Sequence, residues 1–119
     1  MYRSNLIVTK SKAFALRIIK LNQFLFSEKS ITDLRKQILR SGTSIGANVK
    51  EAIRGQSKAD FYAKINIALK EASETEYWLE LLFESGYISQ ESFDSIYSDC
   101  QEIIKILMAI SKTQNSNNS

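Results

Sequence analysis

Apolar side chains recur at every third or fourth position along almost the whole chain, and no proline interrupts this pattern in 119 residues. Such spacing gathers apolar groups on one face of an α-helix, where they pack against other helices. Short segments with glycine and serine divide the pattern into four stretches of roughly 24 to 28 residues joined by tight turns. The sequence therefore predicts an all-α fold, an antiparallel up-down-up-down four-helix bundle.

Capping signals mark the ends of the expected helices. A Ser-x-x-Asp pattern, typical of a capping box, begins the second helix near Ser30 and the third at Ser57. Gly55 and Gly86 are expected to end these two helices. The expected helical ranges are 4–28, 30–55, 57–86 and 89–112. Residues 1–112 thus form the predicted bundle, and the polar segment TQNSNNS at 113–119 is expected to be a disordered tail.

One stripe of each helix is assigned to the core by its spacing. The first helix contributes Ile7, Phe14, Ile18, Leu21 and Leu25, and the second contributes Leu34, Ile38, Ser41, Ile45 and Ala52. The third contributes Phe61, Ile65, Ala68, Ala72, Leu79 and Phe83, and the fourth contributes Phe93, Tyr97, Cys100, Ile104, Leu107 and Ser111.

The composition argues against a membrane protein, a metalloprotein and an enzyme. The longest apolar run, ILMAI at 106–110, is far shorter than the roughly 20 residues that a membrane span needs. The N-terminal residues contain no apolar signal region with a cleavage site, so we expect a cytoplasmic protein. With no histidine in the chain, the usual zinc sets are missing and nothing can activate Cys100 as a nucleophile. We expect Cys100 to fill the core.

Five glutamates in the third helix resemble the carboxylate cluster of a di-iron bundle, which pairs Glu with His at i, i+3. Without histidine that site cannot be assembled in its usual form. Only Glu76 lies close to the inner stripe, and we expect an arginine partner for it. No catalytic residues, cofactor or metal are predicted.

The charges are distributed unevenly along the chain. Residues 1–58 contain twelve Lys and Arg against three Asp and Glu, a net charge of +9, whereas residues 59–119 contain four against ten, a net charge of −6. One interpretation is that the halves neutralise each other across helix contacts. The other is a functional basic surface.

Six cations are candidates for such a surface. Lys36, Arg40, Lys50 and Arg54 fall within an arc of about 80° on the second helix. Arg17 and Lys20 lie on the polar side of the first helix. Cations on a rigid face suit a regular array of phosphates, and the predicted ligand is RNA or DNA. A solvated helix face would show the same pattern.

Gly42 and Gly46 are separated by four residues, but neither the spacing nor the context is that of a phosphate-binding P-loop, because no strand precedes them. Each glycine costs about 1 kcal/mol relative to alanine inside a helix. Close approach by another helix is the expected compensation, by analogy with membrane helices. Asn48 falls near the inner face and is expected to be a buried polar residue that fixes register.

A second apolar stripe, including Val8, Ile19 and Phe26, runs along the first helix. Apolar and aromatic residues also occupy the back of the third. A monomer would leave these side chains in water, so we predict self-association, although scattered surface apolar residues are common. The predicted oligomer interface comprises Val8, Ile19, Phe26, Gly42, Gly46, Ile67, Tyr77, Trp78 and Leu81.

Several motifs together resemble the family of four-helix bundle proteins encoded in intervening sequences of bacterial 23S rRNA genes. The second helix matches at Arg40, Ser44, Ile45, Asn48, Glu51 and Ala52, and the following link at Ser57, Lys58, Asp60 and Phe61. The third helix matches at Ile67, Ala68, Leu69, Ser73 and Glu76, and the next turn at Gly86, Tyr87, Ile88, Ser89, Glu91 and Phe93. Departures are Val49 in place of isoleucine and the small Gly42 and Gly46.

The resemblance implies an antiparallel bundle that assembles into a ring-like homopentamer without known enzymatic activity. Related accessory variability determinant proteins of diversity-generating retroelements are basic barrels that bind nucleic acid and a reverse transcriptase. We therefore expect a non-enzymatic oligomer that binds structured RNA or DNA electrostatically. The alternative is a structural or adaptor module for a protein partner such as a reverse transcriptase.

Overall fold

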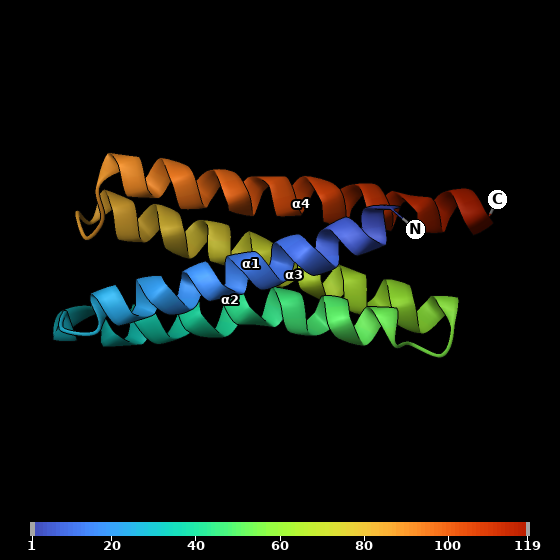
Figure 1. Ribbon diagram of the computed structural model, residues 1–119, viewed down its shortest axis with the longest axis horizontal. Helices are drawn as coiled ribbons and strands as arrows, with labels where there is room; N and C mark the ends of the chain where they lie inside the picture. Colours follow the sequence, from blue (N-terminus) through green and yellow to red (C-terminus); the bar gives the residue numbers. More distant parts are fainter. Residues whose placement is uncertain (1, 119) are drawn as a thin grey trace.

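The computed structural model describes the backbone of residues 2–118 and the side chains of residues 5–114. Four helices, α1 (Tyr2–Leu25), α2 (Thr32–Ile53), α3 (Lys58–Glu84) and α4 (Gln90–Asn118), are joined by short connections, the first of which contains a 3₁₀ turn, η1 (Lys29–Ile31). The helices lie side by side along one axis (Figure 1), and the bundle measures 49 × 22 × 20 Å. The predicted all-α four-helix architecture is confirmed. None of these helices is long and apolar enough to cross a membrane.

The four helices are not packed equally against each other. α2 contacts both α1 and α3, and α3 also contacts α4, whereas α1 and α4 share a smaller contact. Figure 1 shows α1 crossing the bundle obliquely: it is next to α4 near its N-terminal end and next to α2 near its C-terminal end. α1 and α4 therefore diverge toward the end of the bundle that carries the α3–α4 turn.

The predicted core stripes are confirmed in α1 and α2 and are rotated by about one residue in parts of α3 and α4. Tyr62 and Leu82 are buried where Phe61 and Phe83 were expected. In α4 the buried residues are Ile96, Cys100, Ile103, Leu107 and Ile110. The rings of Phe83, Phe93 and Tyr97 stack on each other along the edge of the α3–α4 contact, with centroids 4.4 and 4.6 Å apart. Because these large rings occupy the edge, smaller aliphatic side chains fill the centre.

A pair of hydroxyl groups is buried among the apolar side chains between α2 and α3. Thr75 Oγ1 donates to Ser41 Oγ at 2.8 Å and also lies 2.8 Å from the backbone oxygen of Glu71. Both residues are completely shielded from solvent. Hydroxyls buried in this way lose their hydrogen bonds to water, so the bond between them is needed to offset that loss.

The capping pattern at Ser57 is confirmed, because its Oγ accepts a hydrogen bond from the backbone N–H of Asp60 at 3.0 Å. The pattern at Ser30 is not. Residues 29–31 form η1, α2 begins after Ile31, and the Ser30 hydroxyl lies 3.1 Å from the Tyr87 hydroxyl. Ser30 therefore contacts the α3–α4 turn instead of capping the N-terminus of α2.

The end of α3 agrees with the prediction at Gly86. This residue has a φ of 86°, a left-handed conformation that favours glycine. The N–H of Gly86 donates to Phe83 O, and the N–H of Tyr87 donates to Leu82 O, which is the Schellman pattern.

α4 extends past the boundary at residue 112 that the sequence suggested. Its backbone is helical to Asn118. The Thr113 hydroxyl lies 2.5 Å from the Tyr62 hydroxyl and donates to the Ile110 carbonyl at 2.6 Å. The expected disorder of the tail at 113–119 stays a prediction.

Gly42 and Gly46 lie on α2 where α1 approaches most closely. A Cβ atom at Gly42 would lie 2.7 Å from Cγ1 and 2.9 Å from Cγ2 of the fully buried Ile18. At Gly46 the nearest atom, the backbone oxygen of Ser11, would be 3.4 Å away. The expectation of close helix approach is confirmed, but the approaching helix belongs to the same chain.

Replacing Gly42 by alanine is expected to destabilise the bundle. Overpacking against Ile18 costs about 1–3 kcal/mol, and better helix propensity returns about 1 kcal/mol. The free energy of unfolding should therefore fall by up to about 2 kcal/mol in a urea titration. Gly46→Ala is the matched control and should be neutral or stabilising by up to about 1 kcal/mol. If Gly42→Ala were the more stable variant, the approach of Ile18 would not require glycine.

Candidate functional site

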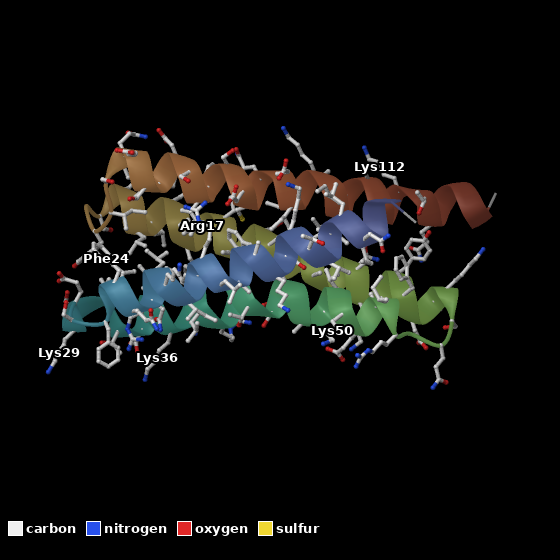
Figure 2. The ribbon with its side chains drawn as sticks, viewed as in Figure 1. Arg17, Phe24, Lys29, Lys36, Lys50 and Lys112 are labelled. Carbon is white, nitrogen blue, oxygen red and sulfur yellow. The ribbon has the colours of Figure 1, made fainter. Side chains whose placement is uncertain are left out.

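Three cations project from one face of α2. Lys36, Lys50 and Arg54 are exposed, and their separations of 14 and 18 residues return to nearly the same side of a helix. Figure 2 shows Lys36 and Lys50 extending from α2 on the side away from α4. At 1.5 Å per residue, Lys36 and Arg54 are roughly 27 Å apart along the helix. Within residues 5–114 none of the three forms an ion pair. We call these three residues the basic row.

A groove between α1 and α2 adjoins the basic row. It has a volume of about 500 Å³, its floor includes Val8, Val49 and Ile53, and Lys50 and Arg54 line it together with Lys12. No acidic residue lines this groove. Lys12 was not among the six cations chosen from the sequence. Lys12 follows Val8 by four residues and therefore lies on the exposed stripe of α1. That spacing could have indicated its place beside the groove.

Of the other three predicted cations, Arg40 lies on α2 within the same arc but is ion-paired, and Arg17 and Lys20 lie on α1. Arg40 donates to Glu71 at 2.8 Å and to Glu74 at 2.5 Å, and the hydrogen bond with Glu74 raises the pKa of its guanidinium above the ordinary value. Arg17 donates to Asp99 at 2.6 Å and to Ser95 at 3.0 Å. Lys20 is exposed beside a different cavity, between α1 and α4. Of the six predicted cations, Lys36, Lys50 and Arg54 therefore share one face of α2 without an ion pair among residues 5–114.

Most of the ion pairs seen among residues 5–114 join a cation of the basic first half to a carboxylate of the acidic second half, and Lys64 with Glu51 is the reverse case. Besides those of Arg17 and Arg40, they are Lys10 with Glu102 at 2.7 Å and Lys64 with Glu51 at 3.4 Å. Exposed pairs of this kind contribute about 0.2–1 kcal/mol each. Neutralisation across helix contacts therefore does occur, but among residues 5–114 it does not include an ion pair with the basic row, although Glu51 and Asp60 line a pocket with Lys50 and Arg54. Neutralisation between helices is thus confirmed for the paired residues, and a functional basic surface stays a prediction.

The second apolar stripe of α1 faces solvent as predicted. Val8 and Ile19 are each 39% exposed and Phe26 is 69% exposed. On α3, Ile67 and Tyr77 are exposed, at 40% and 54%. Within the part of the chain that the structure describes, these five side chains keep between 39% and 69% of their surface exposed.

The remaining residues assigned to the oligomer interface are placed differently. Trp78 packs against the core, because the buried face of α3 is broader than the spacing of its apolar residues suggested. Leu81 is half-buried. Gly42 is buried beneath Ile18, and Gly46 faces Ser11. Trp78 and Gly42 thus make packing contacts within the bundle.

The carboxylates of α3 are held by structural contacts. Burial, with the nearby Glu80 charge, raises the pKa of Glu76, and its hydrogen-bond partner is Gln101 instead of the expected arginine. The Tyr97 hydroxyl donates to Glu80 Oε2 at 2.5 Å, which raises the pKa of Tyr97. The Asn48 amide, half-buried, donates to the Ser44 carbonyl of its own helix. The expected register role of Asn48 is therefore not seen; Ser41 and Thr75 form the buried polar contact instead.

Cys100 is in the core, as predicted. It has no exposed surface, and its thiol donates to the Ala72 carbonyl at 3.4 Å. Burial, followed by the Glu76 and Asp99 charges, raises the pKa of Cys100 to about 12. Since the thiolate is the reactive form, this environment opposes nucleophilic chemistry.

A family model and a solved structure both match this chain over most of its length. Residues 3–109 match the family model described as 23S rRNA-intervening sequence protein. A crystal structure from Bacteroides thetaiotaomicron, of a protein with unknown function from the S23 ribosomal protein family, superimposes with a TM-score of 0.88. That protein is 55% identical, and the alignment covers 92% of this chain and 98% of the other. No curated protein matched.

Native Cys100 is expected to resist thiol reagents at pH 8. Raising the pKa from 9.0 to about 12 lowers the thiolate fraction roughly a thousandfold, and the lack of exposed surface blocks access as well. Reaction with a chromogenic disulfide should be slow in buffer and rapid in denaturing urea. Equal rates under the two conditions would contradict the burial of this thiol.

Proposed function

The chain belongs to the 23S rRNA-intervening sequence protein family, and on this premise we propose that it is a non-enzymatic, self-associating bundle that binds structured RNA or DNA electrostatically. The proposed contact surface is the basic row of α2 with the adjoining groove. The observation that carries the proposal is that Lys36, Lys50 and Arg54 share one helix face and form no ion pair among residues 5–114, while Arg40 on the same face is paired.

The geometry of the basic row suits a nucleic-acid backbone. The row spans roughly 27 Å on a single helix, a distance comparable to about eight steps of 3.4 Å along a duplex. A helix held in a bundle keeps its cations in place, so little ordering is needed on binding. Each phosphate contact releases condensed counterions, which supplies a favourable, salt-dependent free energy. Such contacts carry no sequence information, so the proposal is for recognition of the backbone.

Self-association would strengthen this binding. The exposed stripe of α1 and the exposed Ile67 and Tyr77 of α3 offer two apolar surfaces for contact between copies. A ring-like homopentamer, which the family resemblance implies, would present five basic rows. Linked sites act at a high effective concentration, so several weak contacts can give tight binding when their geometry matches the ligand.

The direct test is fluorescence anisotropy of an RNA hairpin and a DNA duplex at about 50 and 200 mM salt. If a complex makes 6 to 10 phosphate contacts, affinity should fall roughly 10³–10⁵-fold over this range. Absence of binding at 50 mM salt would overturn the nucleic-acid proposal. Salt-insensitive capture of a protein, such as a reverse transcriptase, would support the adaptor alternative.

Reversing two charges of the basic row is expected to weaken binding. Lys36→Glu combined with Lys50→Glu removes two cations, so the slope of log affinity against log salt should become shallower by about 2. The matched control is Lys105→Glu with Lys112→Glu, which makes the same charge change on α4; Figure 2 shows Lys112 on the side opposite Lys36 and Lys50. Equal losses in both double variants would reflect net charge alone and contradict a specific surface.

Adding a charge to the exposed stripe of α1 is expected to reduce the native mass. Ile19→Glu would bury an unpaired carboxylate in the proposed contact, and an unpaired buried charge is strongly destabilising. Light scattering of the native protein measures the change, with Ser98→Glu, on an exposed position of α4, as the control. An unchanged mass for Ile19→Glu would show that this stripe is not a contact between copies.

A further inference from the structure

A second cavity, of about 400 Å³, lies between α1 and α4 where these helices diverge. Its α1 wall consists of Arg17, Lys20, Leu21 and Phe24, which lie about half a turn around the helix from the residues that line the basic groove. The α3–α4 turn and the start of α4 complete it. Its volume is within the range of small-molecule sites.

A contact between α1 and α4 borders the cavity, and the charged residues that line it, Arg17 and Lys20, are both cations. Arg17 ties α1 to α4 through Asp99 and Ser95, so the two helices are joined directly beside the cavity. No acidic residue lines it. Lys20 is exposed and has no ion-pair partner among residues 5–114, so its ammonium group remains available to an anion.

Phe24 supplies an open aromatic face. It is 70% exposed, and within the described side chains no ring or cation lies against it. Other exposed or half-exposed phenylalanines differ: the Arg35 guanidinium lies 4.9 Å above the centre of the Phe26 ring, and Phe83 and Phe93 stack on each other. Figure 2 shows Phe24 at the end of α1, on the side toward the α3–α4 turn.

Lys20 and Phe24 are neighbours on the surface of α1. Residues four apart on a helix have Cβ atoms about 5–6 Å apart, so the ammonium group and the ring can contact one ligand together. Across the cavity, Ser89 and Ser92 offer hydroxyl groups. The Ser89 Oγ accepts the Ser92 backbone N–H at 3.1 Å, which leaves the hydroxyl proton of Ser89 free to donate.

A flat ring, a cation and hydroxyl donors around one cavity match the chemistry of a nucleotide. We propose that this cavity holds one unpaired nucleotide of a bound RNA or DNA strand, with its base on the Phe24 ring and its phosphate at the Lys20 ammonium group. Bases that leave a helical stack are commonly held on aromatic side chains in this way. The inference rests on the proposed function and adds a preference for loops or bulges over uninterrupted duplex.

An apolar side chain from a second copy is the competing occupant. It would use Phe24 and the apolar wall of Leu21, Ile88 and Ile96, but it would cover Lys20 and the serine hydroxyls without replacing their hydrogen bonds to water. A nucleotide satisfies all of these groups, so we favour it.

The test uses two RNA hairpins with identical stems and equal numbers of loop phosphates, one with adenines in the loop and the other with abasic loop residues. The wild-type protein should bind the adenine loop about 5- to 140-fold more tightly, the range for stacking one base on an aromatic ring. Phe24→Ala should bind both hairpins with the affinity that the wild-type protein has for the abasic one. Phe24→Trp should restore the preference. A 2-aminopurine in the loop should lose fluorescence on binding to the wild-type protein and not to Phe24→Ala.

Phe26→Ala is the matched control, because it removes a similarly exposed ring two residues away that lies outside the cavity, and it should keep the adenine preference. If both hairpins bind equally and with steep salt dependence, the nucleotide pocket is wrong and the basic row stands. If neither hairpin binds, the proposed function fails, and this inference with it. A lower native mass for Phe24→Ala would assign the ring to self-association and overturn the inference.

Discussion

The packing of Ile18 against Gly42 determines how α1 lies on the bundle. With a fully buried branched side chain directly against the backbone of α2, α1 approaches α2 more closely than a helix with a side chain at that position would allow. Close contact with α2 goes together with the oblique path of α1 and its divergence from α4. The divergence opens the α1–α4 cavity, and the close contact brings Lys12 beside Lys50 and Arg54. The α1–α2 groove and the α1–α4 cavity thus lie on either side of a helix that packs directly against the backbone of α2 at Gly42.

Periodicity predicted those features that depend on a single helix. The four helices, the cap at Ser57, the glycine end at Gly86 and the exposed stripe through Val8, Ile19 and Phe26 follow from local spacing and local hydrogen bonds. Periodicity could not predict features that depend on how two helices are aligned. Ser30 contacts the α3–α4 turn instead of capping α2, and Arg40 meets two glutamates of α3. Both outcomes are decided by neighbours far away in the sequence.

The two candidate sites also differ in whether they depend on one helix or on several. The basic row lies on one helix face, and its spacing could be measured on a helical wheel, whereas the lack of ion pairs with the described side chains had to be seen in the structure. The cavity at Phe24 could not be predicted at all, because its walls come from α1, from the α3–α4 turn and from the start of α4. From the sequence alone Phe24 was one more apolar residue, and Lys20 was placed with cations that lie elsewhere.

The buried hydroxyl pair of Ser41 and Thr75 has a consequence for the spacing of charges on the surface. If α2 slid along α3 by one turn, about 5.4 Å, the Ser41 hydroxyl would lose its Thr75 partner inside an apolar core, while Thr75 would keep its hydrogen bond to the Glu71 carbonyl of its own helix. The unsatisfied Ser41 hydroxyl would cost about 1–3 kcal/mol, so axial translation of the two helices is opposed at a point remote from solvent. Lys36, Lys50 and Arg54 consequently keep constant positions relative to the rest of the chain. In an assembly of identical copies, the distances between basic rows would be equally constant, and a polyanion would meet charges at fixed intervals.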